Sequence, residues 1–186
     1  MSLNIALLCG SLRKGSYSSC IASFLLSEAS VHNFNMQLVE IENLAFYNED
    51  LDTEGNVPAA WQAFRNTLKD CDGFIFITPE YNRSVPAVLK NAVDVGSRPW
   101  DQNVWTTKPA AVISHSIGGV GGFGANHHLR QSLACLNAAV MAQPEAYLGE
   151  IGSSFDEHGN ICNENTKDFL QRFLRSYKRW CDKIIK

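Results

Sequence analysis

The first side chains that could do chemistry lie in residues 10–19, GSLRKGSYSS, which follow an apolar run and precede a helical pattern. A helix start exposes backbone N–H groups that stabilise an anion, and an arginine can hold two phosphate oxygens at once. The further donors of this loop are Ser11, Arg13, Ser16, Ser18 and Ser19. They predict a loop that binds one terminal phosphate. A serine- and glycine-rich helix cap without a ligand is the alternative.

Gly10 and Gly15 have the spacing of the first half of a triphosphate-binding loop. That motif continues with a lysine for the β- and γ-phosphates and then a hydroxyl residue for Mg²⁺. Ser16 and Tyr17 occupy these positions here. A triphosphate would lack its main counter-charge, so we do not expect a nucleoside triphosphatase.

A second glycine motif, GVGGFG at residues 119–124, matches the G-x-G-x-x-G pattern of dinucleotide-binding proteins. That pattern belongs in the first strand-to-helix turn, which the serine-rich loop already occupies. We expect residues 118–124 to form a flexible loop whose missing side chains let a flat ligand approach the backbone. A glycine-rich surface turn is the alternative.

A third segment, PEYNRSVPAVLKNAVD at residues 79–94, follows the apolar run 73–78. Pro79 and Pro86 bracket a short polar stretch and restrict its backbone, which predicts a stiff loop. A stiff loop at the carboxyl end of a central strand is well placed to hold a ligand.

The hydrophobic pattern supplies the elements that must position these loops. Apolar runs indicate strands at residues 5–9, 36–41, 73–78, 110–114 and 139–142, and helical patterns cover residues 17–29, 58–68, 85–95, 126–136 and 165–184. Continuous apolar strands are typical of a sheet covered on both faces. We predict an α/β fold, a flavodoxin-like doubly wound five-stranded parallel sheet in the order 2-1-3-4-5 with helices on both faces. Ligands of such sheets bind beyond the carboxyl ends of the strands, where the three loops meet.

The composition of the chain excludes several classes of function. The chain has 186 residues, 45% hydrophobic and 19% charged, which predicts one folded domain over residues 1–186. A net charge of −3 and scattered basic residues do not suit nucleic acid, and no apolar stretch has the length of a membrane span. The six cysteines have no regular spacing, which favours a cytoplasmic protein. His127 and His128 lack further ligands at metal spacing, so we expect no metal.

The three loops, in this order and spacing, resemble the NADPH-dependent FMN reductases of flavodoxin-like fold. Within that family they resemble the bacterial quinone and chromate reductases. The most specific segment is PEYNRSVPAVLKNAVD with the SRP that follows it, and the resemblance runs from the first strand to the last helix. It implies an enzyme that passes two electrons from NADPH or NADH through bound FMN to quinones or similar acceptors, such as chromate, azo compounds or free flavin. Such enzymes are usually homodimers or homotetramers, with a neighbouring subunit over the open flavin edge.

The resemblance assigns the FMN contacts to three loops. The phosphate loop comprises Ser11, Leu12, Arg13, Lys14, Gly15, Ser16, Tyr17 and Ser18. The isoalloxazine edge is assigned to Pro79, Glu80, Tyr81 and Asn82, and the other side of the ring to Ser114, His115, Ser116, Ile117, Gly118 and Gly119. No catalytic side chain is expected, because the flavin carries the chemistry.

Three further residues are candidates for roles around the flavin. Arg83 is the candidate contact for the 2′-phosphate of NADPH or for an anionic acceptor, with a solvent-exposed arginine as the alternative. Trp100 and Trp105 are candidates for the subunit roof over the flavin or for a lid within the monomer.

Four residues depart from the usual family pattern. Ser18 stands where Asn is usual, His115 near where a small hydroxyl residue is usual, Ala87 where Gly is usual and Val95 where Trp is usual. The last two indicate packing changes in the helix after the PEYN loop. The first two alter groups beside the proposed flavin, because an amide is lost and a titratable ring is added.

Two other functions are compatible with the same loops. A flavodoxin-type electron carrier would bind FMN without oxidising NAD(P)H, although such carriers tend to be more acidic than this chain. A non-catalytic flavin-binding sensor would also use these loops.

Overall fold

A parallel sheet forms the centre of the computed structural model, which describes residues 2–186. Its strands are β1 (Leu3–Cys9), β2 (Phe34–Leu38), β3 (Gly73–Pro79), β4 (Pro109–His115), β5 (Ala139–Val140) and β6 (Ala146–Leu148). The main path runs β2-β1-β3-β4-β5, and every strand pair is parallel. The expected flavodoxin-like order is confirmed, with the order reversing between β1 and β3.

Two short strands pair with β4 at the edge of the sheet, where a single strand was expected at residues 139–142. β5 pairs with the beginning of β4 at Pro109 and Ala110, whereas β6 pairs with its end. Pro144 lies between the two short strands and cannot donate a hydrogen bond to a ladder. The fifth strand of the prediction is therefore divided in two, and the sheet has a sixth strand.

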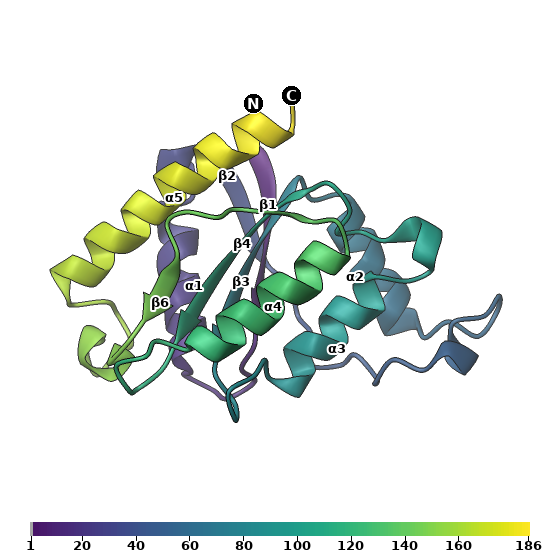
Figure 1. Ribbon diagram of the computed structural model, residues 1–186, viewed down its shortest axis with the longest axis horizontal. Helices are drawn as coiled ribbons and strands as arrows, with labels where there is room; N and C mark the ends of the chain where they lie inside the picture. The colour runs from purple at the N-terminus through teal and green to yellow at the C-terminus, as the bar shows by residue number, and fades with distance from the viewer. Residues whose placement is uncertain (1) are drawn as a thin grey trace.

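Helices cover both faces of the sheet (Figure 1). The helices α1 (Tyr17–Glu28) and α5 (Glu164–Ile184) pack on one face, and α2 (Ala59–Lys69), α3 (Ala87–Gly96) and α4 (Phe123–Cys135) pack on the other. Single 3-10 turns occur at Ser30–His32, Glu49–Leu51, Trp100–Gln102 and Ile151–Ser154. Across residues 2–186, no helix combines the length and the apolar character needed to cross a membrane.

Residues 5–8 of β1 show why this part of the strand is continuously apolar. Ile5 and Leu7 belong to the core beneath α1 and α5, whereas Ala6 and Leu8 belong to the core beneath the other three helices. Side chains of a strand alternate between the two faces of the sheet, so a strand covered on both faces has no solvent-facing position.

Trp105 is part of the core, so it forms neither the subunit roof nor the monomer lid for which it was a candidate. Its ring is fully buried, with its centroid 4.8 Å from that of Phe74, and its Nε1 donates to the Val93 carbonyl at 3.0 Å. A Cβ at Gly96 would lie 2.5 Å from the ring, so the helix backbone closes tightly over it. Trp100, in contrast, is exposed.

Residues 42–57 form a connection that is fastened to the core. Asn91 of α3 accepts a hydrogen bond from the Tyr47 N–H at 2.8 Å. Asp52 receives two hydrogen bonds from the guanidinium of Arg65, at 2.7 and 2.8 Å, and both side chains are buried. Hydrogen bonds and a buried ion pair thus hold a segment that has little regular structure.

Candidate functional site

Three loops meet at the carboxyl edge of the sheet, after β1, β3 and β4. The register places Thr78 opposite Ser114 and Pro79 opposite His115, so the strands end side by side. A cavity of about 220 Å³ opens between the loops. It is lined by Ser11, Arg13, Ser16, Tyr17, Pro79, Glu80, Tyr81, His115, Ser116 and Ile117. All of these belong to the loops that the sequence assigned to flavin contacts.

The first loop is shaped by the cap of α1. Ser16 is the N-cap, and its Oγ accepts a hydrogen bond from the Ser19 N–H at 3.1 Å. Gly15, at φ +62°, supplies the left-handed turn before the cap. The first N–H groups of a helix have no intrahelical acceptor, so those of Tyr17 and Ser18 remain available to an anion.

Arg13 is the positive side chain of this cavity. Its guanidinium carbon lies 5.8 Å from the centre of the Tyr17 ring. No carboxylate of residues 2–186 pairs with Arg13, whereas Arg65 and Arg83 both form ion pairs. Its charge is therefore available to an anionic ligand.

The loop after β3 is as stiff as its prolines predict. The backbones of Tyr81 and Ser84 exchange two hydrogen bonds, at 3.0 and 2.9 Å. Between them Asn82 and Arg83 have φ values of 51° and 64°. Two consecutive left-handed residues closed by such bonds form a tight hairpin turn, which fixes the orientation of Tyr81 at the cavity.

Glu80 ties this loop to α4. One carboxylate oxygen accepts a hydrogen bond from the Ala125 N–H at 3.1 Å, and the other accepts one from Arg83 at 3.0 Å. The negative charge thus lies at the N-terminus of α4, where the helix dipole favours it. With the carboxylate engaged there, the backbone is the part of Glu80 that can contact a flavin.

The glycine-rich loop after β4 has two different halves. A Cβ at Gly118 or Gly119 would meet no atom within 4 Å, so this half is open. A Cβ at Gly121 would lie 2.6 Å from the Tyr147 backbone, and one at Gly124 would lie 2.6 Å from the Arg83 carbonyl oxygen. The expected flexible loop is therefore tightly packed at Gly121 and Gly124, where β6 and the PEYN loop leave no room for a Cβ.

Ser18 and His115, two residues that we expect to depart from the family pattern, are in direct contact. The Ser18 Oγ lies 2.8 Å from the His115 Nε2, and both residues are buried. Burial, with a smaller contribution from the positive charge of Arg13, lowers the pKa of His115 to about 4. The imidazole is therefore neutral at pH 7.

Several predicted contacts do not line the cavity. These are Leu12, Lys14, Gly15, Ser18, Asn82, Ser114, Gly118 and Gly119. The buried Ser114 hydroxyl donates to the Gly121 carbonyl at 2.8 Å and accepts from Asn126 at 3.1 Å, so it holds the glycine-rich loop in place. Ile117, which the resemblance places in the third loop, lines the cavity and is 79% exposed.

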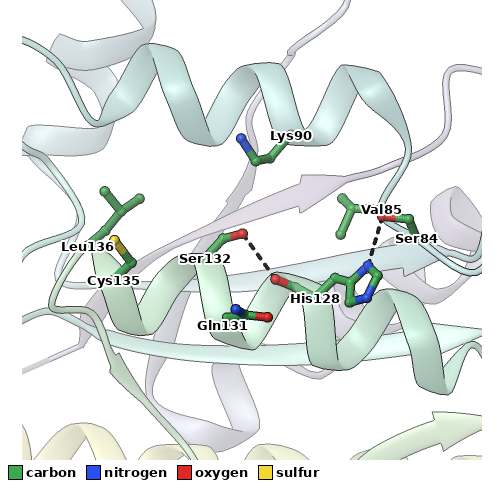
Figure 2. Close-up of a pocket in the computed structure, with 8 residues that line it drawn as sticks. All are labelled: Ser84, Val85, Lys90, His128, Gln131, Ser132, Cys135 and Leu136. Atoms are coloured by element: carbon green, nitrogen blue, oxygen red, sulfur yellow. Dashed lines mark hydrogen bonds between the residues drawn. The ribbon is translucent and has the colours of Figure 1, made fainter.

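A second hollow, of about 540 Å³, lies between α3 and α4 (Figure 2). It is lined by Ser84, Val85, Lys90, His128, Gln131, Ser132, Cys135 and Leu136. Figure 2 shows the His128 ring turned toward Ser84, with Nδ1 2.9 Å from Oγ. The hollow has no guanidinium in its lining, so it matches a flavin phosphate less well than the first cavity. Within residues 2–186, no group of three His, Cys, Asp or Glu side chains is arranged as a metal site.

Comparison with known proteins agrees with the geometry. A family model described as NADPH-dependent FMN reductase matches residues 3–152. A quinone reductase of Pseudomonas putida is 48% identical over 177 residues, which cover 95% of this chain and 94% of the relative. A 2-hydroxy-1,4-benzoquinone reductase of a Burkholderia species is 43% identical over 180 residues, 97% of each chain.

A solved structure is also similar over nearly the whole length. FerB, a flavoenzyme NAD(P)H:(acceptor) oxidoreductase of Paracoccus denitrificans, has a TM-score of 0.90 at 34% identity, covering 98% of each chain. These matches confirm the expected enzyme class, with FMN as cofactor and NAD(P)H as electron donor. The chain belongs to the NADPH-dependent FMN reductase family.

Proposed function

We propose that this enzyme is an FMN-dependent NAD(P)H:quinone oxidoreductase whose flavin lies in the cavity at the carboxyl edge of the sheet. The observation that carries the proposal is the convergence of three loops on that cavity, which combines a free helix start with the guanidinium of Arg13. The names of the Pseudomonas and Burkholderia relatives support a quinone as the acceptor.

The residues of the cavity fit the chemistry of FMN. A phosphate would be held by Ser11, Arg13 and the N–H groups at the start of α1, which are all donors. A flat ring would find open backbone at Gly118 and Gly119 and a rigid edge at the PEYN turn. We propose that the other residues that the sequence assigned to FMN contacts also touch the cofactor.

When bound, FMN supplies the redox chemistry, by which a hydride from NAD(P)H becomes two electrons for the acceptor. The residues of the chain bind and orient the cofactor. Backbone N–H groups of the second and third loops are the dipoles that we expect to stabilise negative charge on the ring. No side chain is required as a general acid or base.

Acceptor and donor meet the protein at the mouth of the cavity. Tyr81 and Ile117 are both exposed there, and their apolar surface suits a planar quinone. Chromate, azo compounds and free flavin are further acceptors within this proposal. Arg83, whose side chain is 77% exposed, is the proposed contact for the 2′-phosphate of NADPH.

The proposal extends to the assembly of the enzyme. We propose that residues 1–186 act as one domain, in the cytoplasm, within a homodimer or homotetramer. Exposed apolar side chains near the cavity support an oligomer, because a neighbouring subunit would remove them from water. They are Leu12, Tyr81, Ile117, Val120 and Phe123.

A spectroscopic experiment tests the proposal. Purified protein supplied with FMN should absorb near 450 nm, lose that band when NADPH is added under nitrogen and regain it on addition of a benzoquinone. A protein that takes up no FMN would overturn the proposed function. Bleaching only by a separate reductase would indicate an electron carrier instead.

A further inference from the structure

The Ser18–His115 contact joins two of the three loops beneath the cavity. Ser18 lies in the first turn of α1, and His115 is the last residue of β4. Their side chains approach to 2.8 Å although 97 residues separate them in the chain. The two residues therefore form one structural unit.

The contact leaves one ring nitrogen of His115 for the cavity. Nε2 is occupied by Ser18, and Nδ1 makes no hydrogen bond to the residues that the structure describes. His115 lines the cavity. Its unpaired Nδ1 is not fully enclosed by protein. A neutral imidazole carries one N–H, so a Ser18 hydroxyl that donates to Nε2 leaves the N–H on Nδ1.

The surroundings of this N–H favour a phosphate oxygen as its acceptor. The Tyr17 ring meets His115 edge-on, with centroids 6.2 Å apart, and the guanidinium of Arg13 lies 5.8 Å from the same Tyr17 ring. The start of α1, with its free N–H groups, is formed by the same residues. Donors and positive charge thus gather at one end of the cavity.

We propose that Ser18 and His115 act as a matched pair in which Ser18 orients the imidazole so that its Nδ1–H donates to the FMN phosphate. This inference rests on the proposed FMN site. It makes His115 a phosphate-binding residue, in place of the ring contact that the resemblance implies, and Ser18 a positioning residue.

Two substitutions of His115 separate the roles of its nitrogens. Asn places an amide nitrogen at about the position of Nδ1, whereas Gln places one at about the position of Nε2. We expect His115→Gln to weaken FMN binding at least about tenfold, the loss of one hydrogen bond to a charged acceptor, and His115→Asn to stay within about threefold of the parent. Riboflavin lacks the phosphate, so its affinity should change by less than about twofold in both variants.

Flavin-free protein is titrated with FMN and with riboflavin, and quenching of flavin fluorescence gives both dissociation constants. The matched control is His128→Gln, which alters an exposed His–Ser contact outside the cavity and should change neither constant. Equal FMN affinity of His115→Gln and the parent would overturn the proposal. So would equal losses of FMN and riboflavin, which would mean a purely structural role.

A second variant keeps the test decisive if His115→Gln does not fold. The double change Ser18→Asn with His115→Ser supplies an amide donor from the first loop in place of the imidazole, and we expect it to bind FMN within about threefold of the parent. A loss of tenfold or more would contradict the matched pair. A parent protein that binds neither flavin would refute the proposed function itself, which distinguishes the two failures.

Discussion

At the scale of single residues, Arg13 and Arg83 both lie near the proposed flavin, but they are held differently. Arg83 donates to Glu80 at 3.0 Å, whereas Arg13 has no acidic partner among residues 2–186. We expect Arg13→Ala to weaken FMN binding about 10- to 100-fold, because hydrogen bonds to a charged group contribute about 1.5–3 kcal/mol. Titration of flavin-free protein measures this loss, while the circular dichroism spectrum should not change.

Arg172→Ala is the matched control for Arg13. Arg172 also lies over an aromatic ring, 5.4 Å from the centre of Phe169, but on α5 rather than in the cavity. The Arg172→Ala variant should bind FMN with the same affinity as the parent protein. If Arg13→Ala also keeps the parent affinity, the phosphate is not held by this loop.

Arg83→Ala tests the proposed contact with NADPH. The substitution should raise KM for NADPH about tenfold and leave KM for NADH nearly unchanged, because only NADPH carries the 2′-phosphate that a guanidinium binds. Steady-state kinetics with both donors measure the ratio. Lys90→Ala, an exposed cation on the neighbouring helix, should keep the parent ratio. An unchanged preference in Arg83→Ala would exclude this role.

At the scale of elements, the irregular segment 42–57 depends on one buried ion pair. Asp52→Ala would leave the guanidinium of Arg65 buried without its partner, and such a loss costs about 3–5 kcal/mol of unfolding free energy. Urea denaturation measures the difference from the parent. Asp94→Ala removes the exposed pair with Lys90 and should cost less than about 1 kcal/mol. Equal losses in the two variants would show that burial does not strengthen the Asp52 pair.

At the scale of the whole molecule, buried histidines make the stability depend on pH. The folded pKa of His115 is about 4, so the unfolded chain, whose histidine titrates near 6.5, binds more protons between these values. The contribution of His115 to the unfolding free energy is therefore largest above pH 6.5 and decreases as the pH falls toward 4. Between pH 7 and pH 5 the loss from this residue is about 2 kcal/mol. Burial lowers the pKa of His32 too, which acts in the same direction.

Urea denaturation of flavin-free protein at pH 7 and pH 5 tests this dependence. His115→Asn removes the titrating ring, so its unfolding free energy should fall by clearly less over the same interval. A variant that loses as much stability as the parent would show that other groups cause the dependence.

The oligomer belongs to the same scale. Light scattering should give a mass about two or four times the 20.6 kDa of one chain. Phe123→Glu places a charge on the apolar surface near the cavity and should produce smaller species, whereas Val31→Glu changes an exposed residue in the turn after α1 and should not. A parent that is monomeric at micromolar concentration would contradict the proposed oligomer.

The sequence alone determined the strand order, the two helical layers and most of the residues that line the cavity. These features depend on local signals: apolar runs, the cap of α1 at Ser16 and the prolines of the PEYN loop. Each signal lies within a few residues of the structure that it specifies. Local patterns of this kind are fully present in the sequence.

Only the tertiary structure decided the features that depend on distant neighbours. The sequence does not reveal that Trp105 lies against Phe74, that Asp52 meets Arg65 or that β6 completes the edge of β4. Most clearly, it does not place Ser18 against His115. A side chain's burial and partners depend on segments far along the chain, and a residue type carries no record of which segment folds against it.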